Sequence, residues 1–535
     1  MNAPIASLIF AFGIAGLLYL DRQRAPRASK ALWLPGIWIA LIASRPLTVW
    51  VGSTPSGNAQ LEGTPLDAAV YAALLALALV VLGRRRAQTS ALLLANRWLL
   101  VYFGFCLVSV AWSYHPDVSL KRWIKAIGDL AMVLIIATDR NPLVAIRRTV
   151  SRVGFVLLPT SLLFIKYFPA LGRDYDADGN VANVGVTLNK NSLGLTVLLI
   201  SLVAVWNLRS LLTHPSADDR GRRLLAQGAL LAFGVTLFGL AVTLNMNSLG
   251  LTVLLISLVV VSNLRSLLTL THPGAADRGR RLLAQGALLA FGVTLFGLAD
   301  CKTCIACFIL GTFLLIACGR PAMAQQPARV HTVCVGLIAL AGLTLALSGG
   351  PGLIETMGRD ASMSGRADIW PAALHAASNP LIGAGFEGFW LSPNVHLFQK
   401  ELLDKGFFPP LVTGLNEAHN GYIEVYLNLG LIGVVLLATI LVSGYLNAVE
   451  SIRRDREFGA FILASTAVAI VYGITEAGFR TMSPAWIFLL MALVCGAGIA
   501  KGQRSVNSVR PRVSRGAYLQ RLREAKDPHR GRLPN

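Results

Sequence analysis

The strongest constraint on the fold of this chain is a series of apolar stretches, separated from one another by short polar or basic turns. Many of these stretches are long enough to cross the roughly 30 Å hydrocarbon layer of a bilayer as a helix. Only 14% of the 535 residues are charged and 54% are hydrophobic, whereas about a quarter of a soluble domain is charged. Because the apolar runs are continuous rather than alternating, they predict helices and not membrane strands. The sequence therefore predicts an all-α, polytopic membrane bundle.

The apolar pattern predicts about 13–15 spans, and two short segments, 31–44 and 122–138, leave the count open. The first run lacks a basic leader and is followed by Arg and Lys, so it is expected to be a retained anchor. The amino terminus is expected outside and the carboxyl tail inside. The expected spans are residues 4–20, 31–44, 66–83, 97–112, 122–138, 150–168, 191–207, 224–244, 247–263, 282–299, 303–318, 330–348, 421–445, 457–476 and 482–499.

The net charge of +21 is concentrated at turns that share one side of the membrane if the spans alternate. Cytoplasmic loops carry such an excess of Lys and Arg, so the pattern indicates orientation and no nucleic-acid partner is expected. The tail 501–535 has no hydrophobic period and is expected to be disordered on the cytoplasmic side, against anionic lipids. The basic clusters are Arg22, Arg24, Arg27 and Lys30; Arg84, Arg85 and Arg86; Arg147, Arg148 and Arg152; Arg220, Arg222 and Arg223; Arg278, Arg280 and Arg281; and Arg453, Arg454 and Arg456.

One internal repeat covers two spans and the basic turn between them. The run that begins at Asn191 recurs from Asn247, and the run that begins at Arg222 recurs from Arg280. Duplicating a hairpin leaves the sidedness of every later loop unchanged. Near-identity indicates a recent duplication rather than the divergent inverted repeat of a transporter. We expect N-terminal spans in 1–190, the duplicated hairpin in 191–300, spans in 301–348, an outer loop in 349–420, C-terminal spans in 421–500 and the basic tail in 501–535.

Three patterns that often carry function are interpreted structurally. Cys301, Cys304 and Cys307 form a C-x-x-C-x-x-C run, but no fourth ligand follows, so small side chains of a helix entering the membrane are expected. The run from Gly383 to Gly388 is formally G-x-G-x-x-G, but it lacks the strand and helix of a dinucleotide site. Acidic residues and histidines are too scattered for a metal shell, so no metal and no cofactor are expected.

The outer loop from Gly349 to Asn420 is the candidate functional segment. A polar, titratable cluster is costly at a membrane edge, so it indicates a working site. The loop includes a short amphipathic stretch that ends at Ala377 and a break at Asn379-Pro380. Aromatic residues suited to the headgroup belt predict a lid on the outer leaflet, and these residues are Trp370, Phe386, Phe389 and Trp390.

Several runs carry a family resemblance. They are Ser364-Gly-Arg366-Ala-Asp368-Ile-Trp370, Asn379-Pro380-Leu-Ile-Gly383-Ala-Gly385-Phe386, and His419-Asn420-Gly421-Tyr422-Ile-Glu424 followed by Leu427-Asn-Leu-Gly430-Leu-Ile-Gly433. They resemble the signature loop and following span of the O-antigen ligase and polysaccharide polymerase family (WaaL/Wzy/ExoQ-like). Ser44-Arg-Pro-Leu47 and the run from Trp112 to Arg122 resemble its exopolysaccharide-production branch. The resemblance covers roughly residues 40–490.

The resemblance implies a metal-independent glycosyltransferase of the bacterial inner membrane. Such an enzyme takes an oligosaccharide from undecaprenyl pyrophosphate on the periplasmic side and passes it to a hydroxyl of an acceptor glycan or lipid. The amino terminus is then periplasmic, the carboxyl terminus is cytoplasmic, and 349–420 is a periplasmic catalytic loop. Proteins of a polysaccharide-export complex are candidate partners. The chemistry agrees, because cleaving a sugar from pyrophosphate requires cations at the leaving group and a base for the incoming hydroxyl.

We assign the base to His419, against the alternative of a histidine that only lines the loop. It precedes an apolar helix, whose positive end disfavours the imidazolium and is expected to keep the ring neutral. Glu424, one turn into that helix, is a second catalytic candidate, because a carboxylate there can orient a base.

Arg366 is the candidate for holding the pyrophosphate, because its planar fork can bind phosphate oxygens in pairs; a pair with Asp368 or a lipid headgroup is the alternative. Lys190 and Lys302 resemble two further family elements, the second with Cys301 in place of serine. The second copy of the repeat carries Met246 where the first has Lys190, and the added hairpin puts in doubt whether both lysines reach one site. The remaining candidate substrate-binding residues are Asp368, Trp370, Asn420, Tyr422, Glu476 and Arg480, with a structural Glu476–Arg480 pair as the alternative for the last two.

Two other classes of function remain open. A transporter or flippase explains the spans and the basic turns, but it predicts charges or broken helices near the bilayer midplane. A passive scaffold protein would not explain the cluster of polar and titratable residues around His419. Within the enzyme class, polymerase and ligase differ only in the acceptor, and the upstream resemblance favours exopolysaccharide polymerisation over ligation to a lipid A-core acceptor.

Overall fold

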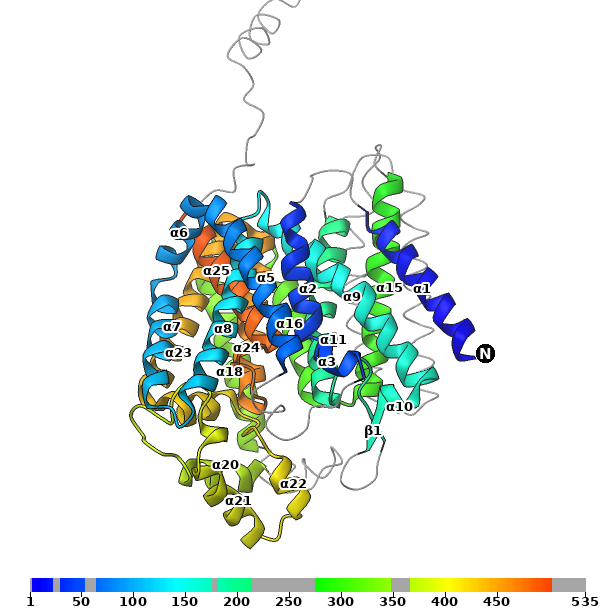
Figure 1. Cartoon of the computed structure of the whole chain (residues 1–535). Helices are drawn as coiled ribbons and strands as arrows, with labels where there is room; N and C mark the ends of the chain where they lie inside the picture. Colours follow the sequence, from blue (N-terminus) through cyan, green and yellow to red (C-terminus); the bar gives the residue numbers. More distant parts are fainter. Residues whose placement is uncertain are drawn as a thin grey trace, which may run out of the picture.

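The computed structural model describes residues 2–22, 29–52, 64–175, 181–213, 275–347 and 366–502. Figure 1 shows a bundle of helices with a small group of helices at one end. The elements are α1 (Ala3–Leu20), η1 (Lys30–Leu32), α2 (Trp33–Ile42), α3 (Leu47–Trp50), α5 (Pro65–Arg84), α6 (Arg86–Ala95), α7 (Arg97–Ser109), η2 (Val110–Trp112), α8 (Pro116–Ala137), α9 (Pro142–Tyr167), α10 (Pro169–Gly172), β1 (Arg173–Tyr175), β2 (Val181–Asn183), α11 (Lys190–Thr213), α15 (Ala275–Ala299), α16 (Lys302–Cys318), α17 (Pro321–Gln325), α18 (Pro327–Leu347), α20 (Arg366–His375), η4 (Phe389–Leu391), α21 (Asn394–Asp404), α22 (Pro409–Gly414), α23 (Gly421–Arg454), α24 (Arg456–Thr475) and α25 (Pro484–Ala500).

The all-α membrane architecture is confirmed. Within the described ranges, the strands are one short antiparallel pair, β1 and β2, with Arg173 opposite Asn183. Seven described helices are long and apolar enough to cross a membrane: α1, α5, α9, α11, α15 from Gly279, α23 and α24. The described part of the chain also has shorter apolar helices at Lys30–Ile42, Lys302–Cys318 and Pro484–Ala500.

Two expected spans have a different form. The segment 97–112 belongs to a helix pair, Arg86–Ala95 and Arg97–Trp112, that is bent by 88°. The segment 122–138 falls largely within α8, which carries Lys121, Arg122 and Asp129 and is not one of the seven helices that are long and apolar enough to cross a membrane. The expected spans 224–244 and 247–263, Met246, loop residues 349–365 and the tail from 503 lie outside the described residues.

The bundle has a deeply buried centre. α11 and α24 are the most buried of the seven apolar helices; α11 packs on α15 and α16, and α24 packs on α16 and α23. α11 comes from the first copy of the repeat and α15 from the second. Helices at the periphery instead expose large side chains such as Phe12, Leu79 and Val435, as a surface that faces lipid does.

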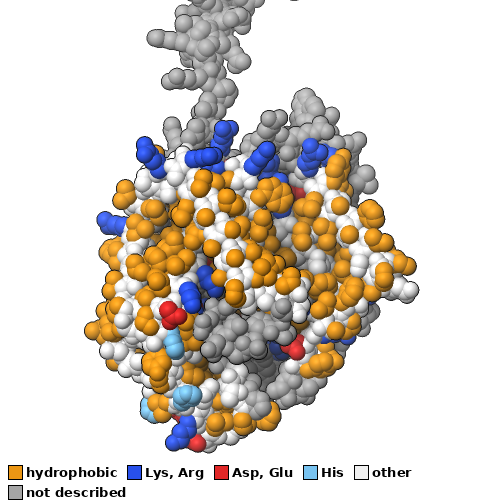
Figure 2. Space-filling model, in the orientation of Figure 1, with side chains coloured by type: hydrophobic (Ala, Val, Ile, Leu, Met, Phe, Trp, Pro, Cys, Tyr) orange, Lys and Arg blue, Asp and Glu red, His pale blue; other side chains and the backbone are white. Residues whose placement is uncertain are grey.

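Lysine and arginine side chains gather at one end of the bundle. Figure 2 shows them along the end opposite α20–α22, with a broad apolar surface between the two ends. This is the distribution that the positive-inside rule describes, and it distinguishes the two ends of the bundle by charge.

The outer loop folds into a small domain of α20, η4, α21 and α22 with an apolar core of its own. We expected its aromatic rings in the headgroup belt, and this was wrong for Phe386 and Phe389. Phe389 is fully buried in the core of the loop, and Phe386 is buried against the bundle. Trp370 and Trp390 are half-buried against the same loop core, because the loop is long enough to enclose rings itself.

The outer domain docks on α23 by direct contact of two backbones. The amides of Leu431 and Ile432 donate to the carbonyls of Pro380 and Leu381, at 2.8 and 3.2 Å. α23 is broken there, because Gly430 has a φ of 62°. A Cβ at Gly430 would lie 2.3 Å from the carbonyl of Leu381, so this close approach requires glycine.

The glycines of the G-x-G-x-x-G run serve the same contact. Gly383, with a φ of 67°, leaves room for the backbone of Asn428, and Gly385 leaves room for Ser113. The rejection of a dinucleotide site is consistent with this arrangement, in which the glycines allow close packing of a loop on helices.

Substituting Gly430→Ala is expected to loosen the outer domain, because the new Cβ meets backbone that cannot move aside. Gly406→Ala is the matched control, since Gly406 also has a positive φ (86°) but has open space around it. We expect the control to cost about 1 kcal/mol of stability and Gly430→Ala roughly 3 kcal/mol. Thermal unfolding of the detergent-solubilised protein measures the difference. Equal destabilisation by the two substitutions would contradict the docking role of Gly430.

Candidate functional site

A cavity of about 260 Å³ lies where three helices begin. The first residues of α11, α16 and α20 are Lys190, Lys302 and Arg366, and all three line the cavity. The amino end of a helix carries a partial positive charge and unpaired N–H groups, and it binds anions. Three such ends, each begun by a basic residue, make this cavity a candidate anion site.

Local sequence explains why these helices begin where they do. Asn189 caps α11, with its side-chain oxygen accepting from the amide of Ser192 at 2.7 Å. Asp300, in the left-handed region at a φ of 46°, turns the chain between α15 and α16, and Cys301 is the N-cap of α16. Side-chain oxygens that accept from the first turn satisfy amides that the helix leaves free.

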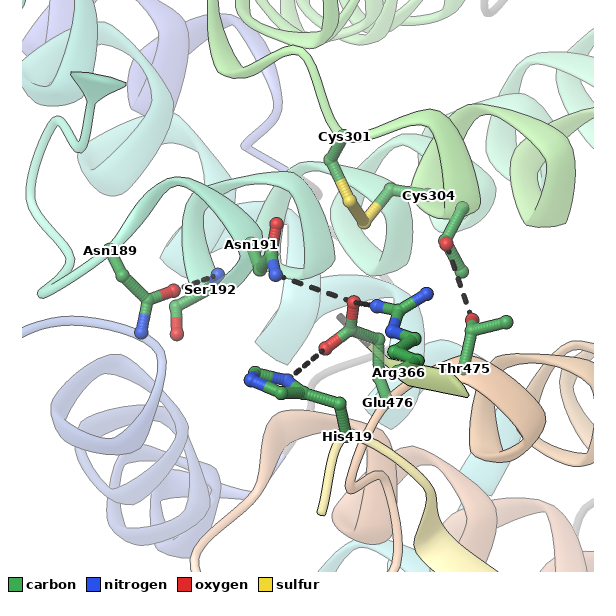
Figure 3. Close-up of a disulfide and its surroundings, with 10 residues drawn as sticks. Asn189, Asn191, Ser192, Cys301, Cys304, Arg366, His419, Thr475 and Glu476 are labelled. Atoms are coloured by element: carbon green, nitrogen blue, oxygen red, sulfur yellow. Dashed lines mark hydrogen bonds and ion pairs between the residues drawn. A yellow bond between two sulfur atoms is a disulfide. The ribbon is translucent and has the colours of Figure 1, made fainter. Parts of the chain in front are cut away.

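Glu476 connects two walls of the cavity. It follows the last residue of α24, is 5% exposed, and accepts from Arg366 at 2.9 Å and from Asn191 at 3.3 Å, both on Oε1. Figure 3 shows the arginine and the asparagine reaching this carboxylate from different elements. Arg366 therefore pairs with Glu476 in this structure, and the alternative of a pair with Asp368 is wrong.

His419 enters the cavity from the loop before α23. Its backbone is in the left-handed region, with a φ of 49°. Ala418, the preceding residue, is held on both sides: Trp370 Nε1 donates to its carbonyl at 3.0 Å, and its amide donates to the carboxylate of Glu424. A strained conformation persists only when its surroundings hold it, and here these two bonds do so.

Two carboxylates flank the His419 ring. Its Nδ1 lies 3.1 Å from Oε1 of Glu417 and 3.5 Å from Oε2 of Glu476. Neither contact has the geometry of a hydrogen bond at Nδ1, so both are described as ion pairs. Burial opposes protonation, but the two carboxylates outweigh it and raise the pKa of His419 to about 9. The expected neutral ring is therefore corrected, because the carboxylates act more strongly than the end of the next helix.

Glu417 is the other member of this charged pair. Burial opposes its ionisation, but His419 and Arg480 together hold the pKa of Glu417 below its usual value. Arg480 reaches Oε2 of Glu417 at 3.3 Å, so the expected Glu476–Arg480 pair is wrong: each glutamate has its own arginine.

The expectation that acids and histidines are too scattered to bind a metal is also corrected. One ligand atom from each of Glu417, His419 and Glu476 lies within 4.8 Å of the others. A cation at this point would compete with Arg366 and Arg480 for the same carboxylates.

The remaining predicted residues support the site from outside the cavity. Asn420 caps α23 by accepting from the amides of Tyr422 and Ile423, and the hydroxyl of Tyr422 donates to the carbonyl of Ile470. Glu424 is buried and also accepts from Trp390 Nε1 at 3.0 Å. Asp368 does not line the cavity; it lies 3.7 Å from Lys405 on the outer surface.

The structure brings together five of the predicted residues: Lys190, Lys302, Arg366, His419 and Glu476. The doubt about the two lysines is removed, because both line one cavity. Sequence reasoning did not include Asn191, Thr303 or Glu417 in the site. Their closeness in the sequence could have identified these three residues, because each lies next to, or two positions from, a residue that was predicted.

The three cysteines were also interpreted incompletely. Cys301 and Cys304 form a disulfide, and Cys301 lines the cavity, whereas Cys307 is free and buried. Their spacing gave the signal, because residues three apart lie on one face of a helix.

The charge of His419 should make part of the stability depend on pH. Its folded pKa of about 9 exceeds the ordinary 6.5, so the stabilisation is complete below pH 6.5 and is lost as the pH rises through about 9. We expect the wild type to melt roughly 2 °C above His419→Gln at pH 6.5, and the gap to close by pH 10. Thermal unfolding of both proteins in detergent tests this. A constant gap would show that His419 is not charged in the folded protein.

Two comparisons with known proteins show what this chain is similar to. The O-Antigen ligase family model matches residues 285–438, which include Lys302, Arg366 and His419. The chain is also 24% identical over 400 residues to the exopolysaccharide production protein ExoQ of Rhizobium meliloti (strain 1021), covering 74% of this chain and 75% of that protein. Both findings show what the chain is similar to: residues 285–438 are similar to the O-antigen ligase family, and a longer part of the chain is similar to an exopolysaccharide production protein.

Proposed function

We propose that this protein is a membrane glycosyltransferase that polymerises oligosaccharide units carried on undecaprenyl pyrophosphate, in exopolysaccharide biosynthesis. The observation that carries the proposal is the meeting of three helix amino ends, each begun by a cation, beside His419. A pyrophosphate leaving group needs such a concentration of positive charge. The name of the similar protein, which concerns exopolysaccharide production, supports exopolysaccharide biosynthesis as the process, and polymerisation is our proposal within it.

The proposed reaction has one group-transfer step. The oxygen of an acceptor hydroxyl attacks the anomeric carbon of the lipid-linked sugar. The bond from that carbon to the pyrophosphate oxygen breaks, and the lipid pyrophosphate leaves with the electron pair. The hydroxyl proton passes to His419, which must first be neutral, and Glu417 and Glu476 then stabilise the imidazolium.

The cations have separate roles in this proposal. Lys190 and Lys302 contact the phosphates together with the amides of their helices. Arg366 either stays with Glu476 or exchanges that carboxylate for a phosphate oxygen, since both partners are anionic. Trp370, Asn420, Tyr422 and Glu424 position the His419 loop rather than the substrate.

We further propose that the cavity faces the periplasm of a bacterial inner membrane, with the amino terminus periplasmic and the carboxyl tail cytoplasmic. The basic side chains at the opposite end of the bundle support this orientation. A transporter would carry its polar site near the bilayer midplane. The cavity beside α20 supports a transferase over a transporter.

Replacing His419→Ala should abolish transfer, because the acceptor hydroxyl loses its base. His396→Ala is the matched control, since His396 is an exposed histidine of the same outer domain and should leave transfer unchanged. The measurement is the length profile of lipid-linked and exported glycans in a strain lacking this gene and complemented with each variant. Single repeat units on the carrier support the polymerase, and long chains retained on the carrier indicate a ligase. A wild-type profile with His419→Ala would remove His419 from the mechanism.

Deleting residues 191–246 should retain transfer, because the second copy supplies nearly the same sequence after Lys190. This deletion replaces Trp206, which stacks on Phe461 at 4.0 Å between ring centroids, with Ser262. Deleting 214–271 keeps Trp206 and is the matched control, expected to accumulate to a higher level. Chain length and membrane protein level are measured together. Loss of transfer by both deletions at normal protein levels would mean that the additional repeat copy is required.

A further inference from the structure

The disulfide between Cys301 and Cys304 lies in the wall of the cavity. It spans the first turn of α16, and the two residues that it encloses, Lys302 and Thr303, both line the cavity. Cys301 also lines the cavity, whereas Cys304 is fully buried. One sulfur-bearing residue is therefore at the cavity surface, and the other is behind it.

The disulfide fills the contact between α16 and α11. Gly194 of α11 lies one turn after Lys190, and a Cβ there would be 2.4 Å from Cβ of Cys301 and 2.8 Å from Sγ of Cys304. Figure 3 shows the bridge against the first turns of α11. Two separate thiol sulfurs stand farther apart than two bonded ones. Because the bridge is packed tightly against Gly194, we expect breaking the bond to displace the first turn of α16.

That turn is also connected to the carboxylate wall. The hydroxyl of Thr475 donates to that of Thr303 at 3.2 Å, and Thr475 immediately precedes Glu476. A displacement of the turn would therefore move Lys302 relative to both Lys190 and Glu476. The phosphate-binding arrangement of the cavity depends on this turn.

We propose that the Cys301–Cys304 disulfide is a redox-sensitive clamp that holds Lys302 in position for the phosphates of the substrate. The role in substrate binding rests on the proposed function; the existence and reducibility of the bond do not. A dithiol reductant attacks with one thiolate at Cys301, the cysteine that lines the cavity, and Cys304 leaves and takes up a proton. The second thiol of the reductant then releases Cys301 as a thiol. Two electrons and two protons pass to the protein, and the reductant closes its own disulfide.

The first experiment tests the bond. The full-length protein, purified in detergent without reductant, is unfolded and treated with a maleimide, and labelled cysteines are identified by mass spectrometry. We expect Cys307 to be labelled and Cys301 and Cys304 to be protected. Treatment of the folded protein with dithiothreitol should expose both to labelling. Labelling of the pair without reductant, or protection after it, would overturn the clamp.

The second experiment tests its effect on the cavity, with inorganic pyrophosphate as the probe in a calorimetric titration. Reduction of the wild type should raise the Kd about tenfold, the loss expected for one charge-assisted contact. The double substitution Cys301→Ser/Cys304→Ser should have the raised Kd with or without reductant. Cys307→Ser, the matched control one turn along α16, should respond to reduction as the wild type does. An unchanged Kd in the reduced wild type would overturn the clamp.

The Lys302→Gln variant tests whether the disulfide acts by positioning Lys302 or by a general effect on the stability of the protein. It should bind pyrophosphate weakly and no longer respond to reduction, and in transfer assays reduction of the wild type should raise KM far more than it lowers kcat. A reductant response that persists in Lys302→Gln would overturn the role of Lys302. If the wild type has no transfer activity but its affinity for pyrophosphate still falls on reduction, the proposed function is wrong and the clamp is supported. Normal transfer that is insensitive to reduction would refute the clamp alone.

Discussion

The site depends on the backbone contact between the outer domain and α23. At Gly430 the helix opens, and two of its amides pair with carbonyls of the 380–381 turn. This contact fixes the outer domain over the end of the bundle. Arg366 at the start of that domain and His419 at its end then lie above the amino ends of α11 and α16. Without this backbone contact, the basic residues of the outer domain and those of the bundle would not be held around one cavity.

The second constraint is the cost of concentrating like charges around one cavity. The bundle provides two basic helix ends, and the outer domain provides Arg366 and His419, whose pKa the flanking carboxylates raise against the effect of burial. Glu476 and Glu417 lie among these cations, and each is paired with an arginine. The carboxylates reduce the repulsion among the cations that line the cavity. A dianionic ligand would be attracted by the excess of positive charge and by helix amides together.

Sequence reasoning succeeded for residues whose role follows from their neighbours in the chain. Arg366, His419 and Lys302 were identified from short runs, and all three line the cavity. It failed where a partner comes from a distant element. The partner of Arg366 is Glu476, 110 positions away, and the partner of Arg480 is Glu417. The charge of His419 was misjudged partly for the same reason, because the carboxylate of Glu476 beside the ring comes from a distant element, whereas the nearer carboxylate, that of Glu417, is two positions away in the sequence and was overlooked.

The sequence by itself determined the fold class, because long uncharged runs have no stable alternative to helices in hydrocarbon. It also determined which end of the bundle is basic and which loop is polar enough to carry chemistry. Only the tertiary structure decided that Lys190 and Lys302 share one cavity, although 111 residues separate them. It also decided that Cys301 and Cys304 are bonded and that Phe389 is buried in protein rather than lipid. The physical reason is that ion pairs, close backbone contacts and ring burial depend on distances between helices, which periodicity along one helix does not specify.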